Sequence, residues 1–190
     1  MTDYQKLYNG ISKVAWGYFF VYFDLSLGAV DILPDFVGCV LFLYAINLLK
    51  DEERELSLLK PLGIIMICWT VIVWLGSFCS LQIEGAWQVA DLIIFLVNLY
   101  FQFQLITNMA TIAAKHQTYG YKLDVELLHY RTVQTVMLTG IQLLTYLQPW
   151  LPNMVWVLAS FCMLIAFVVA CILIMRTLFN LRKALPMNQL

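Results

Sequence analysis

The chain has 190 residues, of which 62% are hydrophobic and 12% are charged, and its formal net charge is −1. That charged share is about half the usual value for soluble domains, which leaves too little polar surface to enclose a water-soluble core. The apolar content excludes a disordered chain, and the absence of a basic excess or of paired cysteine spacings excludes nucleic-acid-binding and disulfide-framed classes. The composition therefore predicts an all-α, polytopic membrane protein.

Long uncharged segments predict where the chain crosses the bilayer, because a helix needs about 20 apolar residues to span about 30 Å of hydrocarbon. Such segments cover residues 61–83, 92–114 and 132–175, and prolines at 149 and 152 divide the last one. Two shorter apolar segments, residues 14–30 and 36–49, lie on either side of the turn at residues 31–35. We therefore expect a single transmembrane domain, 1–190, with six helices at about 13–30, 34–50, 61–82, 88–114, 131–148 and 152–177. We also expect the second helix to continue through residues 51–59.

The basic residues predict the orientation of these six helices. With six spans, both tails and the loops at 50–60 and 115–131 share one side of the membrane. That side holds every Lys and Arg of the chain, namely Lys6, Lys13, Lys50, Arg54, Lys60, Lys115, Lys122, Arg131, Arg176, Arg182 and Lys183. Because positively charged loops stay in the cytoplasm, we predict a multi-pass protein of the cell (plasma) membrane with both termini cytoplasmic.

Acidic residues without a basic partner gather in the outer half. We expect Asp24 about two turns below the outer end of the first helix and Asp91 about one turn inside the outer end of the fourth. A carboxylate at bilayer depth costs about 2.5–3.5 kcal/mol, so it normally faces the bundle interior or water. The spacing of Gly17, Asp24, Gly28 and Asp31 predicts that all four share one face of the first helix, where glycines permit close helix approach.

Amides extend this polar surface along the fourth helix. Asp91, Asn98 and Gln102 follow one another at i, i+7 and i+11, which predicts a narrow stripe running inward. A second stripe, on another face, leads to the cytoplasmic end through Gln104, Asn108, Thr111 and Lys115.

These residues predict an outward-opening polar pocket between the first, second and fourth helices. Its ligand would be a cation, a protonated amine or a proton, bound by Asp24, Asp91, Asp31, Asp35, Asn98 and Gln102, with Glu84 at the fringe. The alternative is structural: amides join helices by hydrogen bonds, and Asp91 reaches interfacial water. Asp31 or Asp35 would then simply sit at the positive end of the second helix.

Histidines and cysteines carry no further site. Glu126 and His129 have a spacing found in helical metal sites, but they and His116 are interpreted as solvated residues of an inner loop. The cysteines are isolated within spans and are interpreted as small packing residues; they are Cys39, Cys68, Cys79, Cys162 and Cys171. No catalytic residue, metal or cofactor is expected.

Function is predicted at the level of class. The acidic pocket favours a solute- or cation-binding or transport component, acting as a homo-oligomer or with a partner membrane subunit in the lipid bilayer. The alternative is a non-catalytic accessory, immunity or sensory membrane protein that docks a partner through its charged inner segments. An intramembrane aspartyl-type hydrolase is a weaker alternative, because no Gly-x-Gly-Asp motif flanks Asp24 or Asp91.

Overall fold

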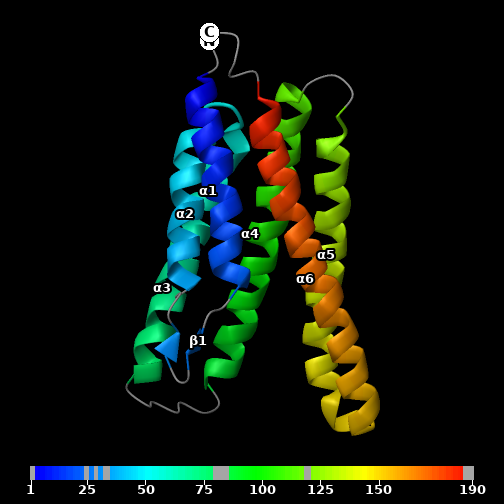
Figure 1. Cartoon of the computed structure of the whole chain (residues 1–190). Helices are drawn as coiled ribbons and strands as arrows, with labels where there is room; N and C mark the ends of the chain where they lie inside the picture. Colours follow the sequence, from blue (N-terminus) through cyan, green and yellow to red (C-terminus); the bar gives the residue numbers. More distant parts are fainter. Residues whose placement is uncertain are drawn as a thin grey trace.

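The computed structural model describes residues 3–23, 26–27, 30–31, 35–78, 86–117 and 121–185. These residues form an all-helical bundle, as the composition predicts. Its six α-helices are α1 (Tyr4–Tyr22), α2 (Asp35–Leu49), α3 (Lys60–Phe78), α4 (Ala86–His116), α5 (Leu123–Leu147) and α6 (Asn153–Ala184). Each helix packs against the next along the chain, and α6 also packs against α1. The helices run alternately up and down, and both termini lie at the same end (Figure 1).

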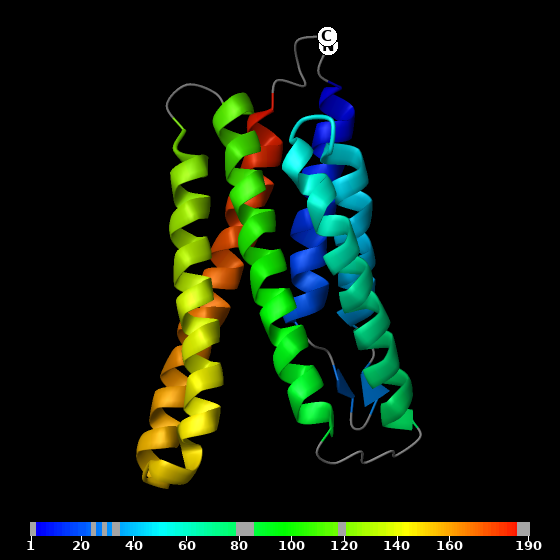
Figure 2. The same ribbon diagram turned by 180° about the vertical axis from the view of Figure 1, so that it is seen from behind.

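All the basic residues belong to the half of the bundle that holds the termini, which we call the basic end; the opposite end is the far end (Figure 2). Among the described helical segments, three are long and apolar enough to cross a membrane: Arg54–Gly76, Val89–His116 and Asn153–Ala184. The helix α2 is a shorter apolar helix. Length and composition thus support a membrane protein with at least these three candidate spans.

The first helix differs from its predicted bounds of 13–30. It begins at Tyr4, where the Asp3 side chain accepts a hydrogen bond from the Lys6 backbone N–H at 3.1 Å, and it ends at Tyr22. The earlier start has a signal in the sequence, because Leu7, Ile11 and later apolar residues recur at helical spacing and are buried. The early end coincides with Asp24, Ser26 and Gly28, three residues of low helix propensity.

A short antiparallel ribbon follows α1 in place of the predicted outer helical turns. The strands β1 (Ser26–Leu27) and β2 (Val30–Asp31) pair Ser26 with Asp31 and Leu27 with Val30. Asp31 therefore does not share a helix face with Gly17, and that prediction is wrong. The ribbon lies beyond the far ends of α1 and α2, between α3 and α4 (Figures 1 and 2).

The chain does not continue as a helix after α2, contrary to the prediction for residues 51–59. Glu53 is extended, and a separate 3-10 helix, η1 (Arg54–Leu59), leads directly into α3. Its Leu56 and Leu59 are buried in the core, so burial of these apolar side chains holds the connection between α2 and α3 against the bundle.

The last two helices form a long hairpin. A 3-10 turn, η2 (Gln148–Trp150), joins them at the predicted break, and the Trp156 indole N–H donates to the Leu144 carbonyl at 3.1 Å. Both helices extend further toward the basic end than predicted: α5 begins at Leu123, before residue 131, and α6 ends at Ala184, beyond residue 177. Leu123 and Leu127 anchor this extension of α5 in the core.

The buried core is concentrated at the basic end. It is built by buried side chains of α1, α2, η1, α4 and α6, together with the first turns of α5. Toward the far end, the large apolar side chains of α5 and α6 are mostly exposed, including Leu143, Tyr146, Trp150, Met154, Leu158 and Phe161. In water such a surface would be unstable, so it is suited to contact with lipid.

Two glycines allow a close contact between α1 and α2. A Cβ atom at Gly38 of α2 would lie 2.5 Å from the Val21 side chain and 2.8 Å from the Gly17 carbonyl oxygen of α1. A Cβ at Gly17 would lie 2.6 Å from the Phe42 ring. The prediction that Gly17 permits close helix approach is thus confirmed, with Gly38 as its counterpart.

The change Gly38→Ala should lower the unfolding free energy by about 1–3 kcal/mol, because the new methyl group meets backbone that cannot move away cheaply. The matched control is Gly76→Ala on α3, where a Cβ has no neighbour within 4 Å. Thermal unfolding in detergent should show a lower midpoint for Gly38→Ala and an unchanged or slightly higher one for Gly76→Ala. Equal midpoints for the two variants would contradict the close contact.

Candidate functional site

The acidic residues of the predicted pocket are described only in part. Asp24 and Glu84 lie outside the described residues, and Asp31 is described only through its backbone in β2. Asp35 is the first residue of α2 and is exposed, as expected for a carboxylate at the positive end of a helix. Asp91 is exposed near the start of α4. Convergence of these carboxylates on one ligand stays a prediction.

The amide stripe of α4 becomes more buried with distance from the far end. Asp91 is exposed, Asn98 is half-buried, and Gln102 is only 4% exposed. Among the described residues, neither amide atom of Gln102 has a hydrogen-bond partner, and the buried Oδ1 of Asn98 has none either. Leaving such groups unpaired costs about 1–3 kcal/mol each, so this face of α4 carries unused capacity to bind a polar ligand or water.

A second buried glutamine, Gln134, differs from Gln102 because both of its amide atoms have hydrogen-bond partners. Gln134 of α5 is also 4% exposed, but its Oε1 accepts from the Tyr18 hydroxyl at 3.2 Å and its Nε2 donates to the Cys171 sulfur at 3.7 Å. This amide therefore joins α1, α5 and α6, which is the structural role that the sequence left open for intramembrane amides. Gln102 has no such bonds to other described residues.

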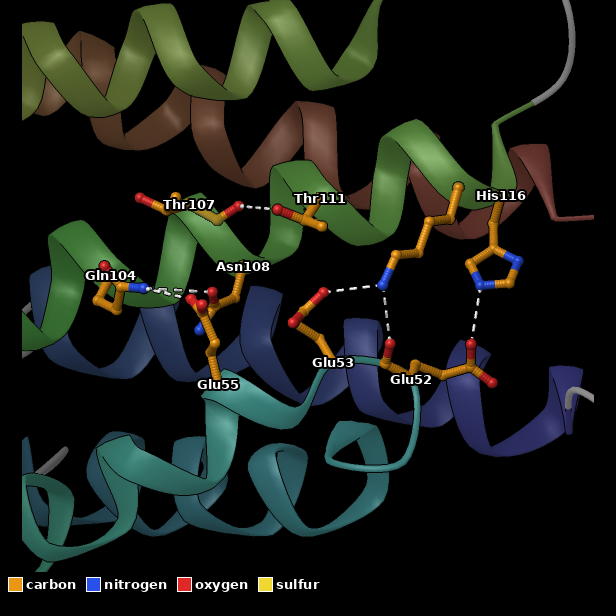
Figure 3. A network of polar contacts seen from close by, with 9 residues as sticks. Glu52, Glu53, Glu55, Gln104, Thr107, Asn108, Thr111 and His116 are labelled. Atoms are coloured by element: carbon orange, nitrogen blue, oxygen red, sulfur yellow. Dashed lines mark hydrogen bonds and ion pairs between the residues drawn. The ribbon is translucent and has the colours of Figure 1, made fainter.

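The second polar stripe of α4 binds the loop between α2 and η1 (Figure 3). The Lys115 ammonium lies 2.8 Å from the Glu53 carboxylate and donates to the Glu52 carbonyl at 3.1 Å. The His116 Nε2 lies 3.0 Å from the Glu52 carboxylate, and Gln104 donates to Glu55 at 3.2 Å. These contacts hold the 52–55 loop on α4, so its carboxylates are already engaged within the chain.

The start of α5 is capped by a side chain from the end of α4. The Gln117 Oε1 accepts from the Leu123 backbone N–H at 2.9 Å, and its Nε2 donates to the Asp124 carboxylate at 2.8 Å. The hydrogen bond from Gln117 holds the pKa of Asp124 below its ordinary value. This contact stabilises the helix start at neutral pH and is lost as the pH falls through the pKa of the folded state.

Arg131 was used in the sequence analysis only to predict the orientation of the helices, but the structure gives it specific contacts with α4. Its guanidinium lies 4.0 Å from the centre of the Phe103 ring, and its Nη1 donates to the Thr107 hydroxyl at 2.7 Å. Its buried Nε has no hydrogen-bond partner among the described residues. The signal was present in the sequence, because Arg131 is the last charge before the long uncharged segment of α5 and α6.

The remaining candidate residues do not form a second site in the described part of the chain. Cys39 and Cys171 are buried, Cys68 and Cys162 are exposed, all four are free thiols, and Cys79 lies outside the described residues. Within the same ranges, no three His, Cys, Asp or Glu side chains come together in an arrangement able to hold a metal ion.

Comparison of the chain with protein-family models, with curated proteins and with solved structures gives no match. Its function is therefore inferred from its own residues.

The two buried glutamines should respond oppositely to Gln→Leu substitution. Gln102→Leu removes an unpaired buried amide and should raise the unfolding free energy of solute-free protein by about 1–3 kcal/mol. Gln134→Leu leaves the Tyr18 hydroxyl buried without its acceptor and should lower it by a similar amount. Thermal unfolding of dialysed protein in detergent measures both changes. A loss of stability in Gln102→Leu as large as in Gln134→Leu would mean that Gln102 already has a partner.

Proposed function

We propose that the protein is a six-span plasma-membrane protein, with both termini cytoplasmic, that binds a small cationic solute from the outer side. The site would lie between α1, α2 and α4, with the Gln102 amide at its inner limit. The observation that carries the proposal is that Gln102 is buried in the bundle with neither amide atom hydrogen-bonded to another described residue.

The membrane orientation follows from charge. Each of four helices carries a basic residue at the basic-end limit of its uncharged stretch: Lys13, Lys60, Arg131 and Arg176. Placed in the cytoplasmic interface, these residues leave the uncharged parts of the bundle in hydrocarbon. The basic end is then cytoplasmic, and the far end, with Asp35 and Asp91, faces outward.

The uncharged part of α1 is too short to cross the hydrocarbon, which supports a water-accessible outer half of the bundle. The uncharged helical part of α1, residues 14–22, is about 13 Å long, well short of the roughly 30 Å of hydrocarbon. The chain beyond it includes the β1–β2 ribbon. Non-helical backbone is tolerated at membrane depth only where protein covers it or where it lines a water-filled space. A polar space beside the ribbon would satisfy this requirement and would give solutes a path to Asn98 and Gln102.

The chemistry of the lining favours a cation. The charged groups of the outer half are carboxylates, since every Lys and Arg lies toward the basic end. Carboxylate and amide oxygens are ligands for hard cations and hydrogen-bond acceptors for protonated amines. The accessory-protein alternative loses one of its supports, because the 52–55 carboxylates are held by Lys115, His116 and Gln104 within the chain.

Cysteine accessibility tests the outer path. In a background with the native cysteines replaced by alanine, Asn98→Cys should react with a membrane-impermeant thiol reagent added outside intact cells. Leu105→Cys, at a fully buried position two turns further in, should not react. Lys122→Cys, at the exposed basic end, should react only after the membrane is permeabilised.

Ligand class is tested in the same assay. Sodium, calcium and methylammonium chlorides are added in turn, and at least one should slow the labelling of Asn98→Cys. The further change Asp91→Asn should remove that protection, because it deletes the charge at the entrance. Labelling of Asn98→Cys that is absent from outside, or unaffected by every cation, would count against a cation site here.

A further inference from the structure

The inner boundary of the bundle carries a second polar feature, independent of the proposed solute site. Arg131 lies half-buried on α5, and its guanidinium stacks on the Phe103 ring of α4 at 4.0 Å. The Thr107 hydroxyl accepts from Nη1 at 2.7 Å while it donates to the Phe103 carbonyl at 2.7 Å. Two residues of α4 therefore hold the guanidinium in one place. The hydrogen of the threonine hydroxyl is already donated to the Phe103 carbonyl, so the hydroxyl oxygen faces Arg131 as an acceptor.

The charge of Arg131 has no counterion among the described residues. The three ion pairs found there join Lys6 to Asp3, Lys115 to Glu53 and His116 to Glu52. The carboxylates nearest in sequence on α5 are engaged elsewhere: Asp124 accepts from Gln117, and Glu126 accepts from the Thr177 hydroxyl. A half-buried guanidinium without an anion is expensive, because it has lost hydration without gaining a pair.

The position of Arg131 indicates what supplies the anion. It lies at the start of the uncharged stretch of α5, which in the proposed orientation is the level of the inner-leaflet headgroups. Phosphate diesters are abundant at that level, and a planar guanidinium binds phosphate oxygens through parallel N–H donors. Basic sites between transmembrane helices on the cytoplasmic side bind anionic headgroups by this chemistry.

We propose that Arg131, positioned by Phe103 and Thr107, binds the phosphate of an anionic glycerophospholipid where α4 and α5 pack against each other. The guanidinium N–H groups other than the buried Nε–H and the one bonded to Thr107 donate to the phosphate oxygens. The lipid acyl chains lie along apolar side chains of α5 on the outer side of Arg131, such as Leu138, which is seven residues further on and therefore on nearly the same face of the helix.

The chain offers a matched control for general electrostatic attraction. Arg176 of α6 is also the first charge at the inner limit of an uncharged stretch, but it is exposed and, among the residues that the structure describes, has no aromatic or hydroxyl contact of the kind that holds Arg131. If lipid were attracted only by the general positive charge of the basic end, both arginines would contribute equally to lipid binding. If the site is the one formed by Arg131, Phe103 and Thr107, lipid binding depends on Arg131 and not on Arg176.

Native mass spectrometry tests the proposal. Full-length protein is released from nanodiscs of mixed phosphatidylglycerol and phosphatidylcholine, and retained lipids are counted. Wild type and Arg176→Gln should retain one phosphatidylglycerol in preference to phosphatidylcholine, and Arg131→Gln should retain roughly tenfold less. Arg131→Lys keeps the charge without the planar donors and should fall between them.

Two results would overturn the assignment. Equal lipid loss in Arg131→Gln and Arg176→Gln would show that lipid is held by non-specific electrostatic attraction to the basic end. Stabilisation of wild type by inorganic phosphate as large as that by phosphatidylglycerol would show a site for a soluble anion. A monodisperse size-exclusion profile and an unchanged unfolding midpoint in lipid-free detergent confirm that Arg131→Gln is folded.

Discussion

The cost of an unpaired polar group away from water is the constraint on which this structure depends. Where the described chain places amides or hydroxyls in its packed half, most have partners, as Tyr18, Gln134 and Cys171 do across three helices. Exceptions therefore carry information. Gln102 and Arg131 are two of these exceptions, the first an amide in the bundle interior and the second a cation at the basic-end limit of an uncharged helical stretch. The two proposals made above supply each with the partner that its chemistry requires.

The two ends of the bundle differ in how they are held together. At the basic end, apolar burial and the ion pairs of residues 52–55 hold the helices together, and the glycine contact joins α1 to α2 near the opposite ends of these two helices. Toward the far end, the side chains of α5 and α6 turn outward, and α1 has already ended. A closely packed basic end and exposed apolar side chains toward the far end are consistent with the proposed opening on the outer side.

Sequence patterns predicted the helical class, the start of α2, the break near residues 148–153, and the gathering of basic residues at one end, because these follow from local hydropathy and charge. They failed where tertiary burial overrides hydropathy. Residues 1–13 contain three charges, Asp3, Lys6 and Lys13, and were predicted to be a polar tail, yet Leu7 and Ile11 are fully buried against other helices. The apolar run to residue 30 suggested a full span, yet α1 ends at Tyr22 and a strand pair follows. Gln102 was found as a candidate by its spacing, whereas its lack of a partner and the pairing of Gln134 depend on contacts between distant helices.

A density map of the purified protein in lipid nanodiscs tests the central claim most directly, because it shows what lies against the Gln102 amide. The proposed solute site predicts non-protein density within hydrogen-bonding distance of that amide, continuous with the outer surface past Asn98. A map in which Gln102 is hydrogen-bonded to another side chain of this chain, with a dry and closely packed outer half, would contradict it.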